Sequence, residues 1–420
     1  MANSDFYVAI VGCGVVGSGV ADILLERSED LSRRFARKVA LKRILDIRDF
    51  TGTRYEPYAT KNPDEILDDT SITAVVVTVG GLDFAYNISK KALLAGKHVI
   101  TSNKEVVAEH GRELTTIAFE KGIRFCFEAS SGGGVPIIRP LNICMRANEY
   151  TDIKGIVNGT TNFILSRMET DNLSFEDALE LAKQRGYAEA DPSADVDGFD
   201  AARKISVLSM VAFDRFVDYK AIPCRGIRDV THDDIELAAE LCHGRVRLIA
   251  SCVDTGKGLR LSVEPMLVMP TSPLYSVTAV RNGILVGGKY TGHMYFSGRG
   301  AGKLPTGSAV CGDIIDLLGG NDKMASLPEY VTREAVYDNT DDTPARYYIR
   351  LGNFKFGEKP IGSVEGLTEA AGEDLSFADT ENSYAILTGV LMPDELEEFV
   401  SAFCAFYGYE KPDMCLKVIA

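Results

Sequence analysis

The pattern that most constrains the fold lies near the start of the chain. A short apolar run at residues 6–11, of the kind that forms a buried strand, is followed at once by Gly12-Cys-Gly-Val-Val-Gly17 and then by a helical pattern of apolar residues. In a strand, G-x-G-x-x-G, helix unit the glycines permit a tight turn, the approach of a pyrophosphate and close helix packing. The amides at the helix start then face the phosphates. A glycine-rich turn without function is the alternative. We interpret the motif as a dinucleotide site formed by Gly12, Cys13, Gly14, Val15, Val16 and Gly17.

The end of the predicted second strand, residues 39–47, bears on the choice of dinucleotide. In this fold an acidic residue there binds the ribose hydroxyls of NAD, whereas an arginine accommodates the phosphate of NADP. Asp46 and Arg48 favour opposite cofactors, so we expect NAD(P) with NADP slightly favoured. A buried strand at 74–79, which contains Thr78, ends in two glycines where the backbone can approach the cofactor. We place Arg48 and Thr78 in the cofactor site.

A lysine follows the next predicted strand, residues 98–101. Ligands of open α/β sheets bind beyond the carboxyl ends of the strands, so Lys104 stands where chemistry takes place. The alternative is a solvated lysine that opens the helix predicted at 105–121. Lys104 is a candidate residue for catalysis and for substrate and cofactor binding.

A carboxylate and three glycines follow the predicted strand at 123–127. The segment 128–135, which begins at Glu128, can curl so that several carbonyl oxygens and one acid converge, and such a set suits a hard cation. A hinge between domains is equally compatible with this composition. The segment is not a P-loop, because no Gly-Lys-Ser/Thr follows it. The glycine-rich segment 298–303 fails the same test, since Leu304 follows Lys303.

The stretch 155–211 carries an acid-rich loop ahead of a predicted helix. Asp200 and Lys204 are four residues apart, so they lie on one face of that helix. Such a face can hold the charged groups of an amino acid while the lysine sits beside a reacting oxygen. An ordinary surface ion pair, worth a few tenths of a kcal/mol, is the alternative. The acids of the loop are Glu189, Asp191, Asp195 and Asp197.

Composition excludes several classes of partner. The net charge of −15 argues against nucleic acid and against an anionic membrane, because phosphate binding needs clustered Lys and Arg. The nine cysteines form no CxxC pair, and we find neither a signal-peptide pattern nor an apolar run of about 18 residues. We therefore expect reduced thiols and a cytoplasmic location. The five histidines are not spaced as a metal pair, which argues against zinc.

The 420 residues suffice for about three domains. A dinucleotide-binding domain is predicted for residues 1–136 and 299–330, where an apolar helix at 308–318 returns to it, and a second domain for residues 137–298. Beyond a polar break at 339–344, residues 345–420 show strand and helix patterns typical of a βαββαβ module. The expected class is α/β: a Rossmann domain, an α+β substrate and dimerisation domain, and a C-terminal ferredoxin-like domain.

These motifs together resemble homoserine dehydrogenase over roughly residues 6–320. The resemblance implies an NAD(P)-dependent oxidoreductase that interconverts L-homoserine and L-aspartate 4-semialdehyde in threonine and methionine biosynthesis. It also implies dimerisation through the sheet of the substrate domain, and we expect a homodimer or homotetramer. The segments that carry it, besides the glycine motif, are Thr101-Ser-Asn-Lys104, Glu128-Ala-Ser-Ser-Gly-Gly-Gly-Val-Pro136, Asn158-Gly-Thr-Thr-Asn162, Gly186-Tyr-Ala-Glu-Ala-Asp-Pro192 and Asp200-Ala-Ala-Arg-Lys204.

The resemblance implies roles for individual residues. Lys204 matches the catalytic lysine that gives a proton to the aldehyde oxygen as hydride arrives, and Lys104 matches a second lysine that touches substrate and cofactor. Glu189 and Asp200 match the acids that hold the substrate. Gly300 lies in a loop that closes back on the nicotinamide. The family's site for a monovalent cation, sodium or potassium, matches Glu128 with the carbonyls of Ser131, Gly133 and Val135.

The tail, residues 345–420, resembles an ACT domain, with which many family members sense threonine. It departs from the usual pattern after its first strand, where it reads Gly357-Glu-Lys-Pro360-Ile-Gly362. Threonine is therefore an effector to be tested. Near the cofactor site, Thr51-Gly52-Thr53 precedes Arg54 where many relatives have an earlier second basic residue, which leaves strict NADP preference open.

Two competing functions remain at this point. An aspartate semialdehyde dehydrogenase needs a thiolate nucleophile with a base, and no cysteine has a recognisable nucleophile setting. The second competing function is a non-catalytic amino-acid sensor built on an inactive dehydrogenase. The retention of Lys104 and Lys204, and of the acids Glu189 and Asp200, argues against it.

Overall fold

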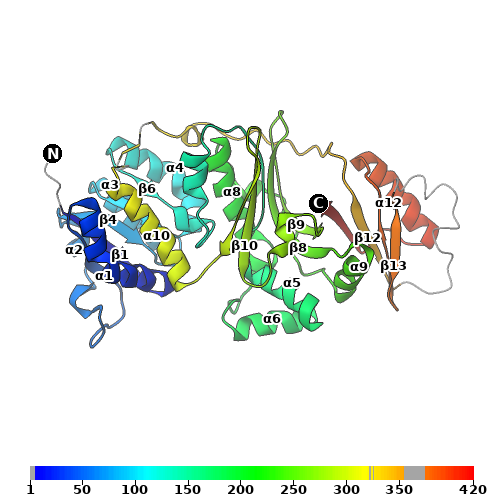
Figure 1. The fold of residues 1–420 in the computed structure, drawn as a ribbon, viewed down its shortest axis with the longest axis horizontal. Coiled ribbons are helices and arrows are strands. Elements are labelled where there is room, and N and C mark those ends of the chain that lie inside the picture. Colours follow the sequence, from blue (N-terminus) through cyan, green and yellow to red (C-terminus); the bar gives the residue numbers. More distant parts are fainter. Residues whose placement is uncertain (1–4, 321–322, 325, 354–373) are drawn as a thin grey trace. The chain divides into compact units, whose positions relative to one another are not determined.

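The computed structural model describes residues 5–320, 323–324, 326–353 and 374–420, and they form two compact units (Figure 1). The first takes in Met1–Ile153, Arg203–Ala221 and Gly287–Val336, and the second takes in the remaining segments, Lys154–Ala202, Ile222–Val286 and Tyr337–Ala420. These units do not coincide one to one with the three predicted domains. The three-domain division stays a prediction.

A parallel sheet forms the centre of the first unit. Among the described residues its strands follow the order β3-β2-β1-β4-β5-β6, so the chain reverses direction beside β1, as in a doubly wound dinucleotide fold. The neighbouring strands pair in parallel. The bounds are β1 Phe6–Val11, β2 Val39–Leu45, β3 Ala59–Thr60, β4 Ile72–Val77, β5 His98–Thr101 and β6 Phe125–Cys126. This arrangement confirms the predicted Rossmann fold.

Helices connect these strands and cover them. The first crossover helix, α1 (Val15–Phe35), packs along α10 (Lys303–Leu318), and the two helices lie side by side in Figure 1. Val310, Ile314 and Leu317 of α10 are buried in one core with the strands, so the apolar helix near the end of the unit returns to this fold as predicted. The other helices of the unit are α2 Asp64–Leu67, α3 Asp83–Leu94 and α4 Lys104–Glu120.

Three of the predicted strands differ in their ends. The second strand stops at Leu45, and Ile47 is 90 % exposed, because the chain turns where Asp46 accepts the Cys13 amide. The predicted strand at 74–79 ends at Val77, so that Thr78 follows it. The predicted strand at 123–127 is reduced to Phe125–Cys126, since Glu128–Ser130 forms a 3-10 turn.

The second unit is built on a mixed sheet. Its strands follow the order β10-β7-β8-β9-β15-β12-β14-β13, and β8 and β9 form a long antiparallel hairpin. The segments predicted as sheet at 260–269 and 283–292 correspond to β9 and to parts of β10 and β11, which is Gly292–Arg299. The bounds are β7 Tyr150–Ile156, β8 Arg245–Asp254, β9 Leu259–Val268, β10 Arg281–Gly288, β12 Tyr347–Gly352, β13 Ser376–Asp379, β14 Ser383–Leu387 and β15 Met414–Ile419.

Several helix ends in the chain follow their local signals. Ser174 caps α6 by accepting the Asp177 amide, and Gly186 past its end has a φ of +71°. Helix α8 begins in the second unit and ends in the first. The remaining helices are α5 Gly159–Asp171, α6 Phe175–Gln184, α7 Ser193–Val196, α8 Phe199–Phe213, α9 His232–Cys242 and α12 Pro393–Tyr407. No helix in the described ranges is both long and apolar enough to cross a membrane.

The C-terminal residues form a four-stranded part of the second unit's sheet. The order β15-β12-β14-β13, with α12 packed on one face, is that of a ferredoxin-like βαββαβ module. Residues 354–373, which include the segment 357–362, lie outside the described residues. The closing strand β15 also pairs in parallel with β9, through Val418 with Leu267 and Ile419 with Val268. The module therefore shares one continuous sheet with the residues that precede it.

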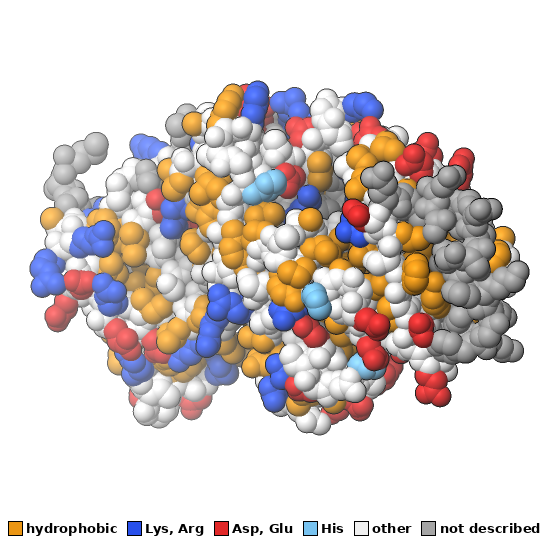
Figure 2. Space-filling model, turned by 45° about the vertical axis from the view of Figure 1, so that its right-hand side comes forward, with side chains coloured by type: hydrophobic (Ala, Val, Ile, Leu, Met, Phe, Trp, Pro, Cys, Tyr) orange, Lys and Arg blue, Asp and Glu red, His pale blue; other side chains and the backbone are white. Residues whose placement is uncertain are grey.

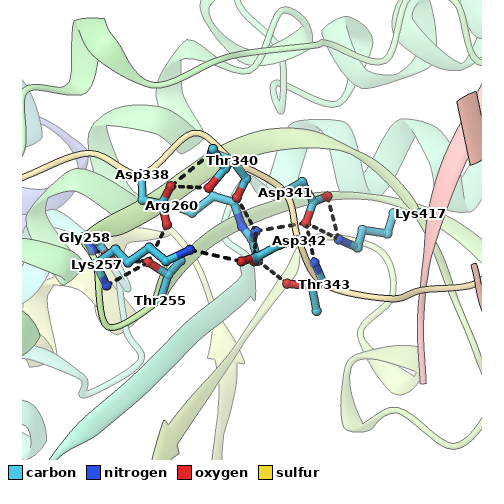
Figure 3. Close-up of polar contacts among 10 residues, drawn as sticks. All are labelled: Thr255, Lys257, Gly258, Arg260, Asp338, Thr340, Asp341, Asp342, Thr343 and Lys417. Carbon is cyan, nitrogen blue, oxygen red and sulfur yellow. Dashed lines mark hydrogen bonds and ion pairs between the residues drawn. The ribbon is translucent and has the colours of Figure 1, made fainter. Parts of the chain in front are cut away.

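An acidic linker, residues 338–343, lies across the β8–β9 hairpin in the second unit (Figure 3). The guanidinium of Arg260 pairs with Asp341 at 2.9 Å and donates to the Thr340 carbonyl at 2.9 Å. Lys417 of β15 also pairs with Asp341, at 3.0 Å, and Thr255 donates to Asp338 at 2.6 Å. The polar break seen in the sequence is thus a fixed segment held by basic residues of two strands.

Candidate active site

The glycine motif of the first unit forms a tight turn between β1 and α1. The hydroxyl of Thr78 donates to the Gly12 carbonyl at 2.6 Å, and a Cβ at position 17 would lie 2.0 Å from that same oxygen. Gly14, the N-cap of α1, is exposed, and a Cβ there would meet no atom within 4 Å. The turn therefore presents the amides at the start of α1 to open space, as the phosphates of a dinucleotide require.

Asp46 and Arg48 form a pair beside this turn. Arg48 donates from Nε and from a terminal nitrogen to the Asp46 carboxylate, at 3.0 and 2.8 Å, and the amide of Cys13 donates to it at 2.7 Å. The Arg48 hydrogen bonds, together with backbone donors, hold the pKa of Asp46 well below its usual range. The two residues that pointed to opposite cofactors thus share one bidentate contact, with Asp46 only 8 % exposed and Arg48 52 %.

Lys104 opens α4 at the carboxyl end of β5. Asn103 caps the helix by accepting the amides of Glu105 and Val106, and its side-chain nitrogen donates to the Gly81 carbonyl at 2.8 Å. The Asn103 amide in turn donates to the Thr101 hydroxyl at 3.0 Å. The Thr-Ser-Asn-Lys segment is therefore fixed to the end of β4, and it holds the half-buried Lys104 at the edge of the sheet where ligands bind.

The second candidate lysine belongs to the part of α8 that lies in the first unit. Arg203, the residue before Lys204, pairs with Glu105, the residue after Lys104, at 3.8 Å. Tyr219 adds a second contact to α4 through its hydroxyl, which donates to Glu109 at 2.6 Å. These contacts bring the start of α4 beside α8, at the positions next to both lysines.

The predicted cation segment lies against the loop that contains Gly300. The Gly134 amide donates to the Arg299 carbonyl at 3.0 Å, and a Cβ at Gly133 would lie 1.9 Å from the Gly300 carbonyl oxygen. The carboxylate of Glu128 accepts the amides of Ile137, Ile138 and Arg139 at 2.6–2.9 Å. Both carboxylate oxygens therefore already accept hydrogen bonds. No cluster of three or more His, Cys, Asp or Glu suited to a metal occurs in the ranges described.

In the second unit, Asn158 forms hydrogen bonds with two acids of the predicted substrate segment. Its side-chain nitrogen donates to Asp195 at 2.7 Å and to Asp200 at 2.8 Å, while its side-chain oxygen accepts the Thr161 amide as the N-cap of α5. Asp200 is buried, at 5 % exposure. One asparagine thus joins the start of α5, the acidic loop and the start of α8.

Glu189 lies exposed in the loop that leads to α7. The loop is held to α5 by the hydroxyl of Thr160, which donates to the Tyr187 carbonyl at 2.7 Å, and by contact of the Tyr187 and Phe163 rings. The neighbouring Asp191 accepts from the Ser193 hydroxyl and amide, which lowers its pKa. Asp197 pairs with Arg228. Among the loop acids, Glu189 and Asp191 are exposed.

The thiols near the sheet are poorly suited to nucleophilic catalysis. Burial raises the pKa of Cys13 to about 11 and that of Cys311 to about 12. Burial also raises the pKa of Cys126, which lies at the end of β6. A thiolate is the nucleophile in cysteine chemistry, so these side chains do not support the semialdehyde dehydrogenase alternative.

Comparison with known proteins agrees with this geometry. The model of the homoserine dehydrogenase NAD-binding domain matches residues 12–128, and the homoserine dehydrogenase model matches residues 136–315. A homoserine dehydrogenase of Neisseria gonorrhoeae is 34 % identical over 96 % of both chains. The chain belongs to the homoserine dehydrogenase family.

Other relatives of this homoserine dehydrogenase family member span different lengths of it. One from Synechocystis is 39 % identical over 74 % of this chain and 73 % of its own. The crystal structure of a homoserine dehydrogenase from Thiobacillus denitrificans superposes with a TM-score of 0.85 at 29 % identity, covering 99 % of each chain. A hyperthermophilic archaeal homoserine dehydrogenase in complex with NADPH covers 76 % of this chain and 99 % of its own, with a TM-score of 0.62 at 30 % identity.

The sequence gives no individual role to two residues that meet in the structure. Asn158 belongs to the Asn158-Gly-Thr-Thr-Asn162 segment, and Asp195 is one acid of the loop. They are 37 residues apart in the chain, so no local spacing could have paired them. The Asn-Gly-Thr-Thr-Asn segment itself was the available signal, because an Asn at a helix N-cap commonly uses its oxygen for the cap and leaves its amide free to donate.

Proposed function

We propose that this enzyme interconverts L-homoserine and L-aspartate 4-semialdehyde with Lys204 as the proton donor and acceptor. The family and its NAD(P) cofactor follow from the comparisons, and the residue roles are our proposal. The observation that carries it is the start of α8, where the buried Asp200 is held by Asn158 and Lys204 follows one turn later. One helix thus offers a fixed acid and an amine on the same face.

Lys204 would act on the substrate oxygen. A bound nicotinamide supplies hydride to the aldehyde carbon in one direction and accepts it in the other. Negative charge builds on the oxygen during reduction, so a lysine ammonium stabilises that charge and gives up its proton, and the neutral amine takes the proton back in the reverse reaction. Lys104 would hold the substrate beside the cofactor, and its support is the hydrogen-bonded β5–α4 junction.

Acidic residues would bind the amino group of the substrate. Asp200 is fixed and buried, whereas Glu189 is exposed on a loop, so we assign Asp200 to orientation and Glu189 to capture of the ammonium. Asp195 joins them because it shares the Asn158 donor. A substrate that carries both charges needs acidic and basic partners, and we assign the acidic partners to these residues.

We favour NADP as the preferred dinucleotide. Its support is the guanidinium of Arg48, which is 52 % exposed while its contact with Asp46 neutralises the acid that would otherwise repel a phosphate. The cofactor loop would comprise Gly12, Cys13, Gly14, Val15, Val16 and Gly17, with Thr78, Lys104 and Gly300. The solved archaeal relative in complex with NADPH also supports this preference.

Further features of the family are proposed for this chain. A monovalent cation would bind oxygen atoms of Glu128, Ser131, Gly133 and Val135, a segment held against the Gly300 loop. Since the Glu128 carboxylate accepts three amides, its main-chain carbonyl is the better ligand. A homodimer or homotetramer, a threonine effector at the ACT-like tail and a cytoplasmic location remain predictions from the resemblance.

One assay tests the function. Purified protein is mixed with homoserine and either NADP or NAD, and the appearance of reduced cofactor is followed by its absorbance. We expect turnover with both cofactors and a larger kcat/KM with NADP. No turnover in either direction with either cofactor would leave the sensor alternative standing.

A further inference from the structure

Asp22 of α1 connects two loops of the first unit that are far apart in the sequence. Its carboxylate accepts a hydrogen bond from the Tyr55 hydroxyl at 2.6 Å and pairs with the Lys303 ammonium at 2.7 Å. Arg54 lies 3.5 Å away as a third partner. The Asp22 side chain is 14 % exposed, so these contacts are partly shielded from water. Asp22 has no role in the site described above.

The Tyr55 side of the network leads to the adenosine end of the cofactor site. The ring of Tyr55 packs edge-on against Phe50, with 5.9 Å between ring centroids. The guanidinium of Arg48 lies over the Phe50 ring at 5.3 Å from its centroid. A continuous series of contacts therefore runs from the residue proposed for the NADP phosphate to the second turn of α1, through Arg48, Phe50, Tyr55 and Asp22.

The Lys303 side leads to the loop proposed to close on the nicotinamide. Lys303 is the first residue of α10, and only two residues separate it from Gly300. The backbone at Lys303 packs closely against α1. A Cβ at Gly19 of α1 would lie only 2.1 Å from the Lys303 carbonyl oxygen. The same loop contacts the Gly133 segment. A shift of Lys303 would therefore move the Gly300 loop.

We propose that Asp22 is a positioning residue that couples the loop at Arg48–Tyr55 to the loop at Gly300–Lys303, so that both ends of the dinucleotide are held by one carboxylate. This inference rests on the proposed assignment of these loops to the cofactor. Asp22 lies in the second turn of α1, beyond the amides that face the phosphates, so it acts on the cofactor through Tyr55 and Lys303 and not by contact.

The charges of the network support a constraint of this kind. Burial of the Asp22 carboxyl would raise its pKa, but the hydrogen bonds from Lys303 and Tyr55 outweigh burial and lower it. Burial and the bond to Asp22 raise the pKa of Tyr55 to about 12. The carboxylate is thus ionised and the phenol neutral at working pH, which is the state in which both contacts form.

Binding of NADPH to the apo protein tests the proposal by fluorescence titration. We expect Asp22→Asn to raise the Kd for NADPH about tenfold, the order of a lost charge-assisted hydrogen bond. The KM for homoserine should stay within about twofold, since a cofactor-positioning residue makes no contact with the substrate. Asp30→Asn is the matched control, because Asp30 lies on the same helix and pairs only with Arg27 and Arg33 among the ion pairs of the described residues.

A double-mutant cycle separates coupling from local stability. Tyr55→Phe and Lys303→Met each remove one partner of Asp22. If one carboxylate links the loops, the double variant should bind NADPH no more weakly than the worse single variant, whereas independent contacts would give additive losses. Additive losses, or an unchanged Kd in Asp22→Asn, would overturn the inference. If Asp22→Asn does not fold, the cycle alone decides. Wild-type protein that binds neither NADPH nor NADH would instead overturn the proposed function.

Discussion

The side-chain nitrogen of Asn158 lies 2.8 Å from a carboxylate oxygen of Asp200, and this hydrogen bond joins the N-cap of one helix to the first turn of another. The same nitrogen also donates to Asp195. Asn158 thereby supplies a neutral donor to two carboxylates that would otherwise repel each other. A neutral donor does not cancel the charge of a carboxylate, which suits the proposed binding of a substrate ammonium.

Asn158→Asp should weaken substrate binding while leaving the helix cap intact. An aspartate keeps an oxygen for the Thr161 amide, but it replaces the donor by a third carboxylate. We expect the KM for homoserine to rise about tenfold or more, the order of a lost hydrogen bond to a charged group. Steady-state kinetics and the thermal unfolding temperature measure the two effects. Unchanged KM in a folded variant would refute the role of this hydrogen bond.

Lys204→Met should remove proton transfer and leave the fold intact. The loss of a general acid and base lowers kcat by about 10²–10⁴-fold. NADPH binding should be close to normal, because Lys204 is proposed to act on the substrate. Lys91→Met, at an exposed position of α3, is the control and should keep wild-type kcat. A Lys204→Met enzyme with near-normal turnover in both directions would exclude the assigned role.

Arg48→Ala should change the choice of cofactor. Loss of the guanidinium removes a partner for the phosphate of NADP and leaves the Asp46 carboxylate charge unpaired beside it. We expect the Kd for NADPH to rise at least about tenfold and the Kd for NADH to change little, since Asp46 can then accept the ribose hydroxyls. Titration with both cofactors measures the ratio of the two Kd values. An equal loss of affinity for NADPH and NADH would show that Arg48 does not discriminate between them.

Asp313 should give the protein a pH-dependent stability. Burial, and then the charge of Glu128, raise the pKa of this carboxyl to about 7. The folded state therefore keeps a proton that the unfolded chain loses near pH 4, so the free energy of unfolding should fall as pH rises from about 4 to about 7 and then level off.

Asp313→Asn should make the unfolding free energy depend less on pH. The decline that it removes is on the order of 4 kcal/mol at most. The thermal unfolding temperature at pH 5, 6 and 7.5 would reveal it. Asp316→Asn, three residues further along α10, is the control. A wild-type protein whose unfolding temperature rises steadily over this range would contradict the assignment to Asp313.

Arg260→Ala should loosen the acidic linker of the second unit. Arg260 is 18 % exposed and contacts Thr340, Asp341 and Thr343. We expect a loss of about 1–3 kcal/mol in unfolding free energy, because backbone and charged hydrogen bonds are lost together. Lys257→Ala should change stability little, since its pair with Asp342 is largely exposed. If Lys257→Ala lowered the unfolding free energy and Arg260→Ala did not, the linker contacts drawn in Figure 3 would not have the assigned strengths.

On the face drawn in Figure 2, basic and acidic side chains are interspersed. The net charge of −15 argues against nucleic acid as a partner, which stays a prediction. Composition could not locate a site.

Local signals in the sequence were enough for the dinucleotide fold and for many helix ends. The apolar runs, the glycine motif, the Ser174 cap and the helix that begins at Pro393 act over a few residues, and the structure follows them. Family resemblance added roles for residues such as Lys204 that spacing alone would have left as a surface pair.

Tertiary structure alone decided which distant residues meet. Asn158 reaches Asp200 across 42 residues, Asp22 reaches Tyr55 across 33, and β15 adds to the sheet beside β9. No periodicity encodes such contacts, because each depends on how complete helices and strands pack. The sequence therefore determined the elements and the chemistry they carry, and packing determined the partners that hold each charged group in place.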